Sequence, residues 1–170
     1  MNDSYEIDIT SPILPGVGIG VFKLRSHITD YFDIIKYYTV DKLDLYRHDH
    51  QKYAFLQTPF QVVYYIANCL YVSFHTMNGR LMKITAVNGY KGYFNNKTYV
   101  GMPLSKFTGL EPQFYYDPTG EEEWYINPQI KEIAITHDPY FKFVESISVY
   151  VEEMYDDNFE RIGKFDRGTW

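Results

Sequence analysis

The stretch 61-QVVYYIANCLYVSFHTM-77 is followed by Asn78-Gly79, by 80-RLMKITAV-87 and by Asn88-Gly89. Valine, isoleucine, tyrosine and phenylalanine favour strands, and they dominate both runs. Asn-Gly between such runs is the strongest local hairpin signal, because both turn positions need a positive φ. The stretch therefore predicts an antiparallel meander over about 61–100, with a further turn at Asn95-Asn96.

Shorter elements are predicted on either side of this meander. Strand-like patterns cover residues 5–10, 18–24, 42–46, 53–57, 124–126, 132–136 and 141–151. Ser26 can cap a helix that runs to about Tyr37, and Pro103 can start a short helix that ends near Leu110. Together they predict an α+β fold: a mostly antiparallel, meandering, twisted sheet with one or two short helices packed on it.

The chain length of 170 residues suits a single domain spanning 1–170, and residues 156–170 are expected to form a polar C-terminal tail. Residues 20–28 and 99–107 resemble each other, since each reads as a strand, a turn and the start of a helix. Duplication could produce this likeness. The low identity favours convergence on a common type of connection.

The single cysteine, Cys69, cannot form an internal disulfide, which is typical of a reducing compartment. Its apolar neighbours indicate a small buried side chain. The first residues are acidic and polar, unlike a signal peptide, and no apolar run approaches the roughly 18 residues of a membrane span. We therefore expect a cytoplasmic protein without a membrane association.

The charge is distributed unevenly along the chain, whose net charge is −6. Residues 61–110 hold five basic and no acidic residues, whereas residues 111–170 hold fourteen acidic and five basic residues. An acidic surface repels nucleic acid and anionic membranes, and it attracts a basic partner. A basic protein is the expected partner, and nucleic acid is not.

Two patterns suggest a nucleotide or metal site, and each is incomplete. The run Gly16-Val17-Gly18-Ile19-Gly20 lacks the GxGxxG spacing of a dinucleotide loop and the GK[ST] of a phosphate loop. His48-Asp49-His50 places two imidazoles close together but supplies no third ligand. The sequence therefore predicts no cofactor and no metal.

Two further patterns suggest catalysis. His137-Asp138 could join Cys69 or a serine in a triad, although no nucleophile-elbow pattern is present. The run Glu121-Glu122-Glu123 could supply paired carboxylates, but such runs are more often a solvated face or a charged binding surface. No catalytic residue is predicted.

The eighteen tyrosines divide between the core and the surface. Tyrosine is enriched at interfaces, because it offers a large contact area at low entropic cost. Tyrosines beside acids could imitate stacked bases and phosphates toward a basic partner. The predicted partner-binding residues, drawn from 111–125 and 145–160, are Tyr115, Tyr116, Glu121, Glu122, Glu123, Glu152, Glu153, Tyr155, Asp156 and Asp157.

Small, acidic, tyrosine-rich α+β chains of this kind resemble bacterial immunity proteins, the inhibitors of contact-dependent growth-inhibition and related polymorphic toxins. The resemblance is carried by composition and charge over the whole chain and by the opening 18-GIGVFKL-24. It implies a monomer or weak dimer that blocks a cognate toxin domain, often a basic nuclease, without performing chemistry. No functional residue can be transferred position by position.

Two alternatives remain open from the sequence. The first is a small hydrolase-like enzyme whose site is assembled from separate loops. The second is an assembly adaptor that works by strand addition, with residues 61–77 or 141–151 as the exposed edge.

Overall fold

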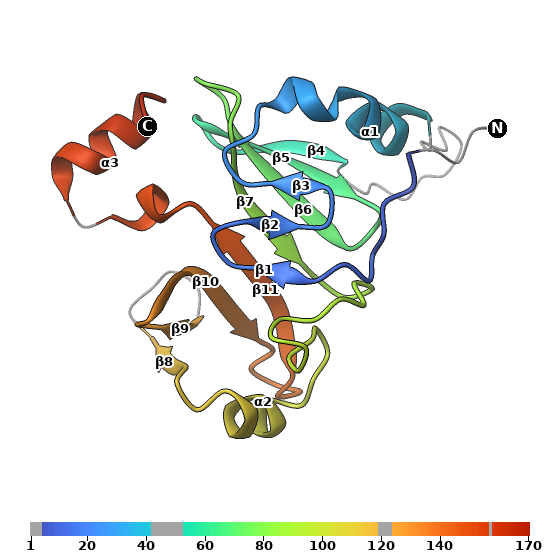
Figure 1. Cartoon of the computed structure of the whole chain (residues 1–170), viewed down its shortest axis with the longest axis vertical. Coiled ribbons are helices and arrows are strands. Elements are labelled where there is room, and N and C mark those ends of the chain that lie inside the picture. Colours follow the sequence, from blue (N-terminus) through green and yellow to red (C-terminus); the bar gives the residue numbers. More distant parts are fainter. Residues whose placement is uncertain (1–4, 42–52, 119–123, 157) are drawn as a thin grey trace.

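The computed structural model describes residues 5–41, 53–118, 124–156 and 158–170. Within these ranges the chain forms three short α-helices and two antiparallel sheets, of three and eight strands, and neither sheet closes into a barrel. The predicted α+β class and the mostly antiparallel sheet are confirmed. Figure 1 shows the arrangement of these elements.

The large sheet runs in the order β4-β5-β6-β7-β11-β10-β9-β8. Its strands are β4 (Ala54–Thr58), β5 (Gln61–Ile66), β6 (Leu70–His75), β7 (Leu81–Ala86), β8 (Tyr115–Asp117), β9 (Trp124–Asn127), β10 (Ile130–His137) and β11 (Val144–Tyr150). The meander is confirmed from residue 61 to 86, but the run 61–77 forms two strands. Ala67 and Asn68, with φ of 52° and 55°, make the tight hairpin between them.

The small sheet contains β1 (Ile13–Leu14), β2 (Gly18–Ile19) and β3 (Phe22–Lys23). This sheet requires glycine at position 18. Gly18 has φ of 146°, and a Cβ there would lie 2.0 Å from the Phe22 carbonyl oxygen. The predicted strand over 5–10 was wrong: these residues form turns and irregular chain. The predicted strand over 42–46 lies outside the described residues.

The helices are short. Residues 28–41 contain η1 (Ile28–Tyr31), α1 (Phe32–Lys36) and η2 (Tyr37–Asp41), and His27 rather than Ser26 forms the cap, together with Asp30. The helix predicted after Pro103 is confirmed as α2 (Leu104–Leu110). The chain ends with η3 (Glu152–Tyr155) and α3 (Phe159–Asp166).

The polar tail expected over 156–170 was wrong in its larger part, because α3 packs on the sheet. Phe165 is 2% exposed, and its ring lies 5.2 Å from His75 at the end of β6. Trp170 approaches the same histidine at 6.0 Å. Seven of the fifteen residues in this segment are charged. Phe165 and Trp170 nevertheless decide its position, because burying large aromatic side chains is favourable.

The core lies on one face of the large sheet. Alternate residues on the inner strands, such as Ile84, Ile147 and Val149, are fully buried against Phe22 of β3 and Phe107 of α2. In Figure 1 the small sheet lies across the first half of the large sheet, α1 is at one end and α2 is at the other. These elements leave the opposite face of the large sheet open, except at one end, where Phe165 packs on His75 and Tyr155 packs on Tyr150.

The two halves of the molecule repeat one topology. A helix followed by a four-stranded meander occurs twice, as α1 with β4–β7 and as α2 with β8–β11, and the two meanders meet at the β7–β11 pair. Thr85 and Ser148 face each other at the centre of this pair, and their hydroxyls are 2.8 Å apart. The large sheet is therefore nearly symmetric about this hydrogen bond.

The connections into the helices also repeat. The Arg25 amide donates to the Leu81 carbonyl at 2.7 Å, and the Gly101 amide donates to the Val144 carbonyl at 2.8 Å. Arg25 and Gly101 both have positive φ, of 72° and 88°. Two further pairs of equivalent hydrogen bonds follow. Leu81 N donates to Ser26 O as Val144 N donates to Met102 O. Ile28 N donates to Gly79 O as Leu104 N donates to Lys142 O. The repetition extends well beyond the strand–helix likeness that the sequence suggested.

Candidate functional site

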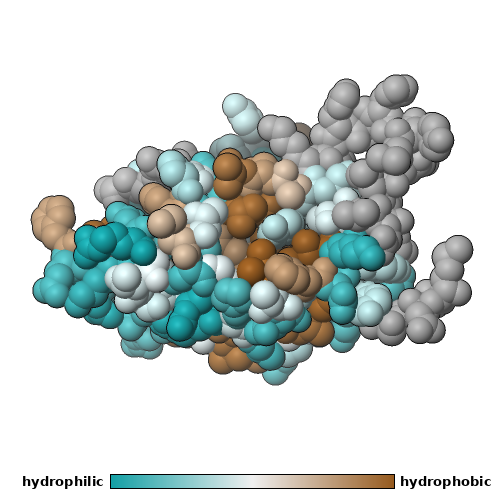
Figure 2. Space-filling model, turned by 90° about the horizontal axis from the view of Figure 1, so that it is seen from above, coloured by the Kyte–Doolittle hydropathy of each residue, from teal (hydrophilic) through white to brown (hydrophobic). Residues whose placement is uncertain are grey.

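The open part of this opposite face of the large sheet forms a groove of about 1290 Å³. Residues of β4, β5, β6, β7, β11 and β10 line it, so both halves of the repeat contribute. Figure 2 looks instead onto the end of the molecule that bears α1, where apolar side chains gather in the middle of a hydrophilic surround. The sequence analysis did not predict this groove.

The floor of the groove consists of small hydroxyl side chains. Ser73, Ser146 and Ser148 are 3%, 7% and 4% exposed, and they alternate with core residues along their strands. Two hydroxyl pairs, Thr85 with Ser148 and Thr136 with Ser146, lie at 2.8 and 2.7 Å, so they satisfy one another across neighbouring strands. Small, satisfied side chains let an occupant approach the sheet closely.

One wall of the groove is aromatic. The rings of Tyr65 and Tyr71 are stacked with centroids 4.8 Å apart, and Phe55 meets Tyr71 edge-on at 6.4 Å. The Tyr65 hydroxyl donates to the Asn68 carbonyl at 2.6 Å, which fixes the ring. Burial, followed by the neighbouring Tyr71 and Cys69, raises the pKa of Tyr65, so the Tyr65 hydroxyl keeps its proton near neutral pH. This wall presents rigid, amphipathic surfaces for contact.

Charged groups are sparse along the groove. Lys83 lies on β7, with its ammonium 5.5 Å from the ring of Trp124, and Glu145 lies on β11. His137 reaches the lining as well, but its ring packs between Tyr116 and Tyr125 at 5.8 and 5.6 Å. No group of three or more potential metal ligands occurs among the described residues. Aromatic rings and hydroxyls dominate the lining, which suits binding.

The candidate nucleophile Cys69 lies in the core. It is 1% exposed, which confirms the prediction of a buried side chain, and it does not line the groove. Burial raises the pKa of its thiol to about 11, so the thiolate that a nucleophile needs is scarce at neutral pH. The triad partners suggested by the sequence, His137 and Asp138, lie at the other half of the sheet. The histidines at 48 and 50 lie outside the described residues.

The predicted partner-binding tyrosines lie on the acidic half, outside the groove lining. Tyr115 and Tyr116 belong to β8, the edge strand, and are 51% and 39% exposed. Tyr155 of η3 is 42% exposed, and its ring packs on Trp124 and Tyr150 at 5.0 and 4.7 Å. All three have surface available to a partner, but they do not form one continuous patch with the groove wall.

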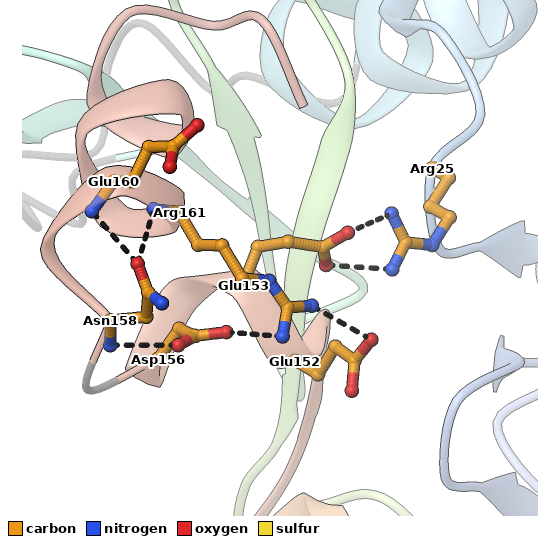
Figure 3. Close-up of polar contacts among 7 residues, drawn as sticks. All are labelled: Arg25, Glu152, Glu153, Asp156, Asn158, Glu160 and Arg161. Carbon is orange, nitrogen blue, oxygen red and sulfur yellow. Dashed lines mark hydrogen bonds and ion pairs between the residues drawn. The ribbon is translucent and has the colours of Figure 1, made fainter.

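Those predicted acids that the structure describes, Glu152, Glu153 and Asp156, form ion pairs within the chain (Figure 3). The Glu153 carboxylate accepts two hydrogen bonds from Arg25, at 2.8 and 2.7 Å. Arg161 contacts Asp156 at 2.8 Å and Glu152 at 3.4 Å. Glu121, Glu122, Glu123 and Asp157 lie outside the described residues. The described acids therefore have a structural role, which the sequence did not indicate.

Replacing Glu153 by glutamine is expected to weaken folding in a pH-dependent way. Partial burial raises the pKa of Glu153, but the hydrogen bonds and charge of Arg25 outweigh it, so the pKa lies below its ordinary value of 4.5. A lowered pKa stabilises the fold above the unfolded-state pKa, and this contribution is lost as the pH falls through the folded-state pKa. Solvent screening limits the effect to about 1 kcal/mol.

Urea unfolding of the wild type and Glu153→Gln at pH 7 and near pH 3 measures this effect. We expect the variant to be less stable at pH 7 and the difference to shrink below pH 4.5. Glu160→Gln is the control, because the pair of Glu160 with Lys164 is exposed and should not contribute measurably. A difference between wild type and Glu153→Gln that is the same at both pH values would contradict the role of this ion pair.

The edges proposed for strand addition were wrong. Residues 61–77 form β5 and β6, and residues 141–151 contain β11, and each of these strands pairs with a neighbour on both sides. The edges of the large sheet are β4 and β8. Strand addition by the segments that the sequence suggested is therefore excluded by their position.

No described helix is long and apolar enough to cross a membrane. No family model matches this chain, and searches of the curated proteins and of the solved structures found no match either.

Proposed function

We propose that this protein is an immunity protein that binds a cognate toxin domain in the cytoplasm and blocks it by occlusion. The observation that carries the proposal is the groove of about 1290 Å³ on the face of the large sheet opposite the core. Small-molecule sites usually occupy about 300–1,000 Å³ and enclose their ligand. A wider, open groove suits a loop or helix of another protein.

The lining supports a protein as the occupant. Tyr65 and Tyr71 offer rigid aromatic surfaces, which are the commonest anchors at protein interfaces. The floor of serine and threonine hydroxyls can hydrogen-bond a polypeptide backbone without demanding a charged ligand. Affinity would come from the aromatic wall, and the depth of the groove would set the shape of the inserted element.

The charge of the chain supports a basic partner. Residues 111–170, which include β10 and β11 of the groove, carry fourteen acidic and five basic residues. The internal ion pairs neutralise some of these acids locally, but the excess remains and acts at long range. Such a field raises the association rate of a basic protein such as a nuclease.

The test is capture of the partner from host lysate at low salt, followed by reconstitution. A basic protein that is retained at low salt and released at high salt is purified, and its toxic activity is measured as this protein is added. We expect the activity to disappear near an equimolar ratio. A partner that binds but keeps its full activity, or a lysate in which no basic protein is retained, would refute the proposal.

A further inference from the structure

The connection between β10 and β11, residues 138–143, carries two strongly exposed aromatic side chains. Tyr140 is 88% exposed and Phe141 is 79% exposed. Their neighbours Pro139 and Phe143 line the groove, and the rings of Phe141 and Phe143 are stacked at 6.5 Å. The exposed pair therefore stands at the rim of the groove.

This turn is held in one conformation. The Asp138 carboxylate accepts hydrogen bonds from the amides of Tyr140 and Phe141, at 2.8 and 2.6 Å. The Asp138 amide donates to the Phe143 carbonyl at 2.9 Å, and the Lys142 amide donates to the Asp138 carbonyl at 3.0 Å. Because the turn is already ordered, a partner that binds it does not pay the entropy of fixing a loop.

The first half of the molecule contains the equivalent turn, residues 75–80. The His75 ring accepts a hydrogen bond from the Met77 amide at 3.3 Å, as Asp138 does from Tyr140. The Gly79 amide donates to the His75 carbonyl at 2.7 Å, which matches Lys142 and Asp138. Gly79 and Lys142 both have positive φ, of 66° and 54°. The two turns share one backbone design.

The two turns differ in what lies over them. The C-terminal segment contacts part of the first turn: the Asn78 side chain donates to the Gly168 carbonyl at 3.0 Å, and Phe165 and Trp170 pack on His75. Met77, which corresponds to Tyr140, stays 68% exposed. The contrast lies at the next position, because Asn78 is half-buried whereas Phe141, which corresponds to it, is 79% exposed. In the first turn, an aromatic segment of the same chain thus packs against this turn conformation.

We propose that Tyr140 and Phe141 anchor a partner protein, whose apolar surface packs on turn 138–143 beside the groove, much as α3 and Trp170 pack on part of turn 75–80. The inference rests on the proposed function and deepens it, since the partner is the toxin domain held in the adjoining groove. The partner must present an apolar cleft that accepts two aromatic rings beside the segment inserted in the groove. The net charge of −6 disfavours an anionic membrane as the alternative occupant.

Site-specific photo-crosslinking in host cells tests the contact directly. A photoreactive phenylalanine replaces Tyr140 in one full-length protein and Phe159 in the control, because Phe159 is 92% exposed on α3. We expect one crosslinked protein from Tyr140 and none from Phe159. That protein is then purified and used as the binding probe.

The purified probe is titrated with wild type, with Tyr140→Ala/Phe141→Ala and with Phe159→Ala. We expect the Kd to rise at least about 30-fold for the double variant and to stay unchanged for the control. Both substitutions are at exposed positions, and circular dichroism checks that the variants fold. No crosslink from Tyr140, or an unchanged Kd for the double variant, would overturn the inference.

Further outcomes separate this inference from the proposed function. If the double variant keeps its affinity while Tyr65→Ala/Tyr71→Ala loses it, the anchor fails and groove binding stands. If the anchor is confirmed but the bound probe keeps its toxic activity, the proposed function fails. Cosedimentation with phosphatidylcholine–phosphatidylglycerol vesicles that requires Tyr140 and Phe141 would show that a membrane is the occupant. Self-association in ultracentrifugation that requires them would show that a second copy is the occupant. Either result would overturn the inference.

Discussion

The double substitution Tyr65→Ala/Tyr71→Ala is expected to raise the Kd of the toxin complex at least about 100-fold, which corresponds to about 3 kcal/mol. These two stacked rings form the aromatic wall of the groove, with centroids 4.8 Å apart. Buried aromatic anchors at the centre of an interface carry most of its binding energy. Isothermal titration calorimetry with the purified partner measures the change.

Tyr93→Ala is the matched control for this pair. Tyr93 is 45% exposed and stacks edge-on with Tyr99 at 5.5 Å, but it does not line the groove. Its removal should leave the Kd unchanged. The far-ultraviolet spectrum and urea midpoint of the double variant show whether it is folded at the assay temperature. Binding of the folded double variant with wild-type affinity would exclude the groove as the partner site.

The substitution Phe165→Ala is expected to lower the free energy of unfolding by about 3–4 kcal/mol. Phe165 is 2% exposed, and its ring contacts His75, Phe60 and Trp170. Truncation would leave a cavity between α3 and the end of β6, because these rings are held by the sheet and cannot collapse fully. The expected loss is a large part of the stability of a single domain. Urea unfolding measures it.

Phe159→Ala provides the comparison within the same helix. Phe159 is 92% exposed at the first position of α3, so its truncation should change the free energy of unfolding by less than about 0.5 kcal/mol. If Phe165→Ala costs less than about 1 kcal/mol, the C-terminal segment behaves as the polar tail that the sequence predicted, and the packing of α3 on β6 is not part of the stable fold.

Local patterns were sufficient for much of the fold. The antiparallel strands at 61–86, the helix after Pro103, the turn at Asn95-Asn96 and the burial of Cys69 follow from side-chain periodicity and from backbone preferences of a few residues. The same reasoning failed over 5–10, because alternation alone does not supply a neighbouring strand. It also failed at 156–170, where the packing of Phe165 and Trp170 outweighs the many charged residues.

The class of the fold, the meander and the acidic charge could be predicted from the sequence, because they depend on residues close together in the chain or on composition alone. The groove could not be predicted, because its floor joins Ser73, Thr85 and Ser148 from three paired strands. The role of Glu153 could not be predicted either, because its partner Arg25 is 128 residues away. Pairing between distant segments is a property of the whole fold, and no local pattern encodes which residues it will bring together.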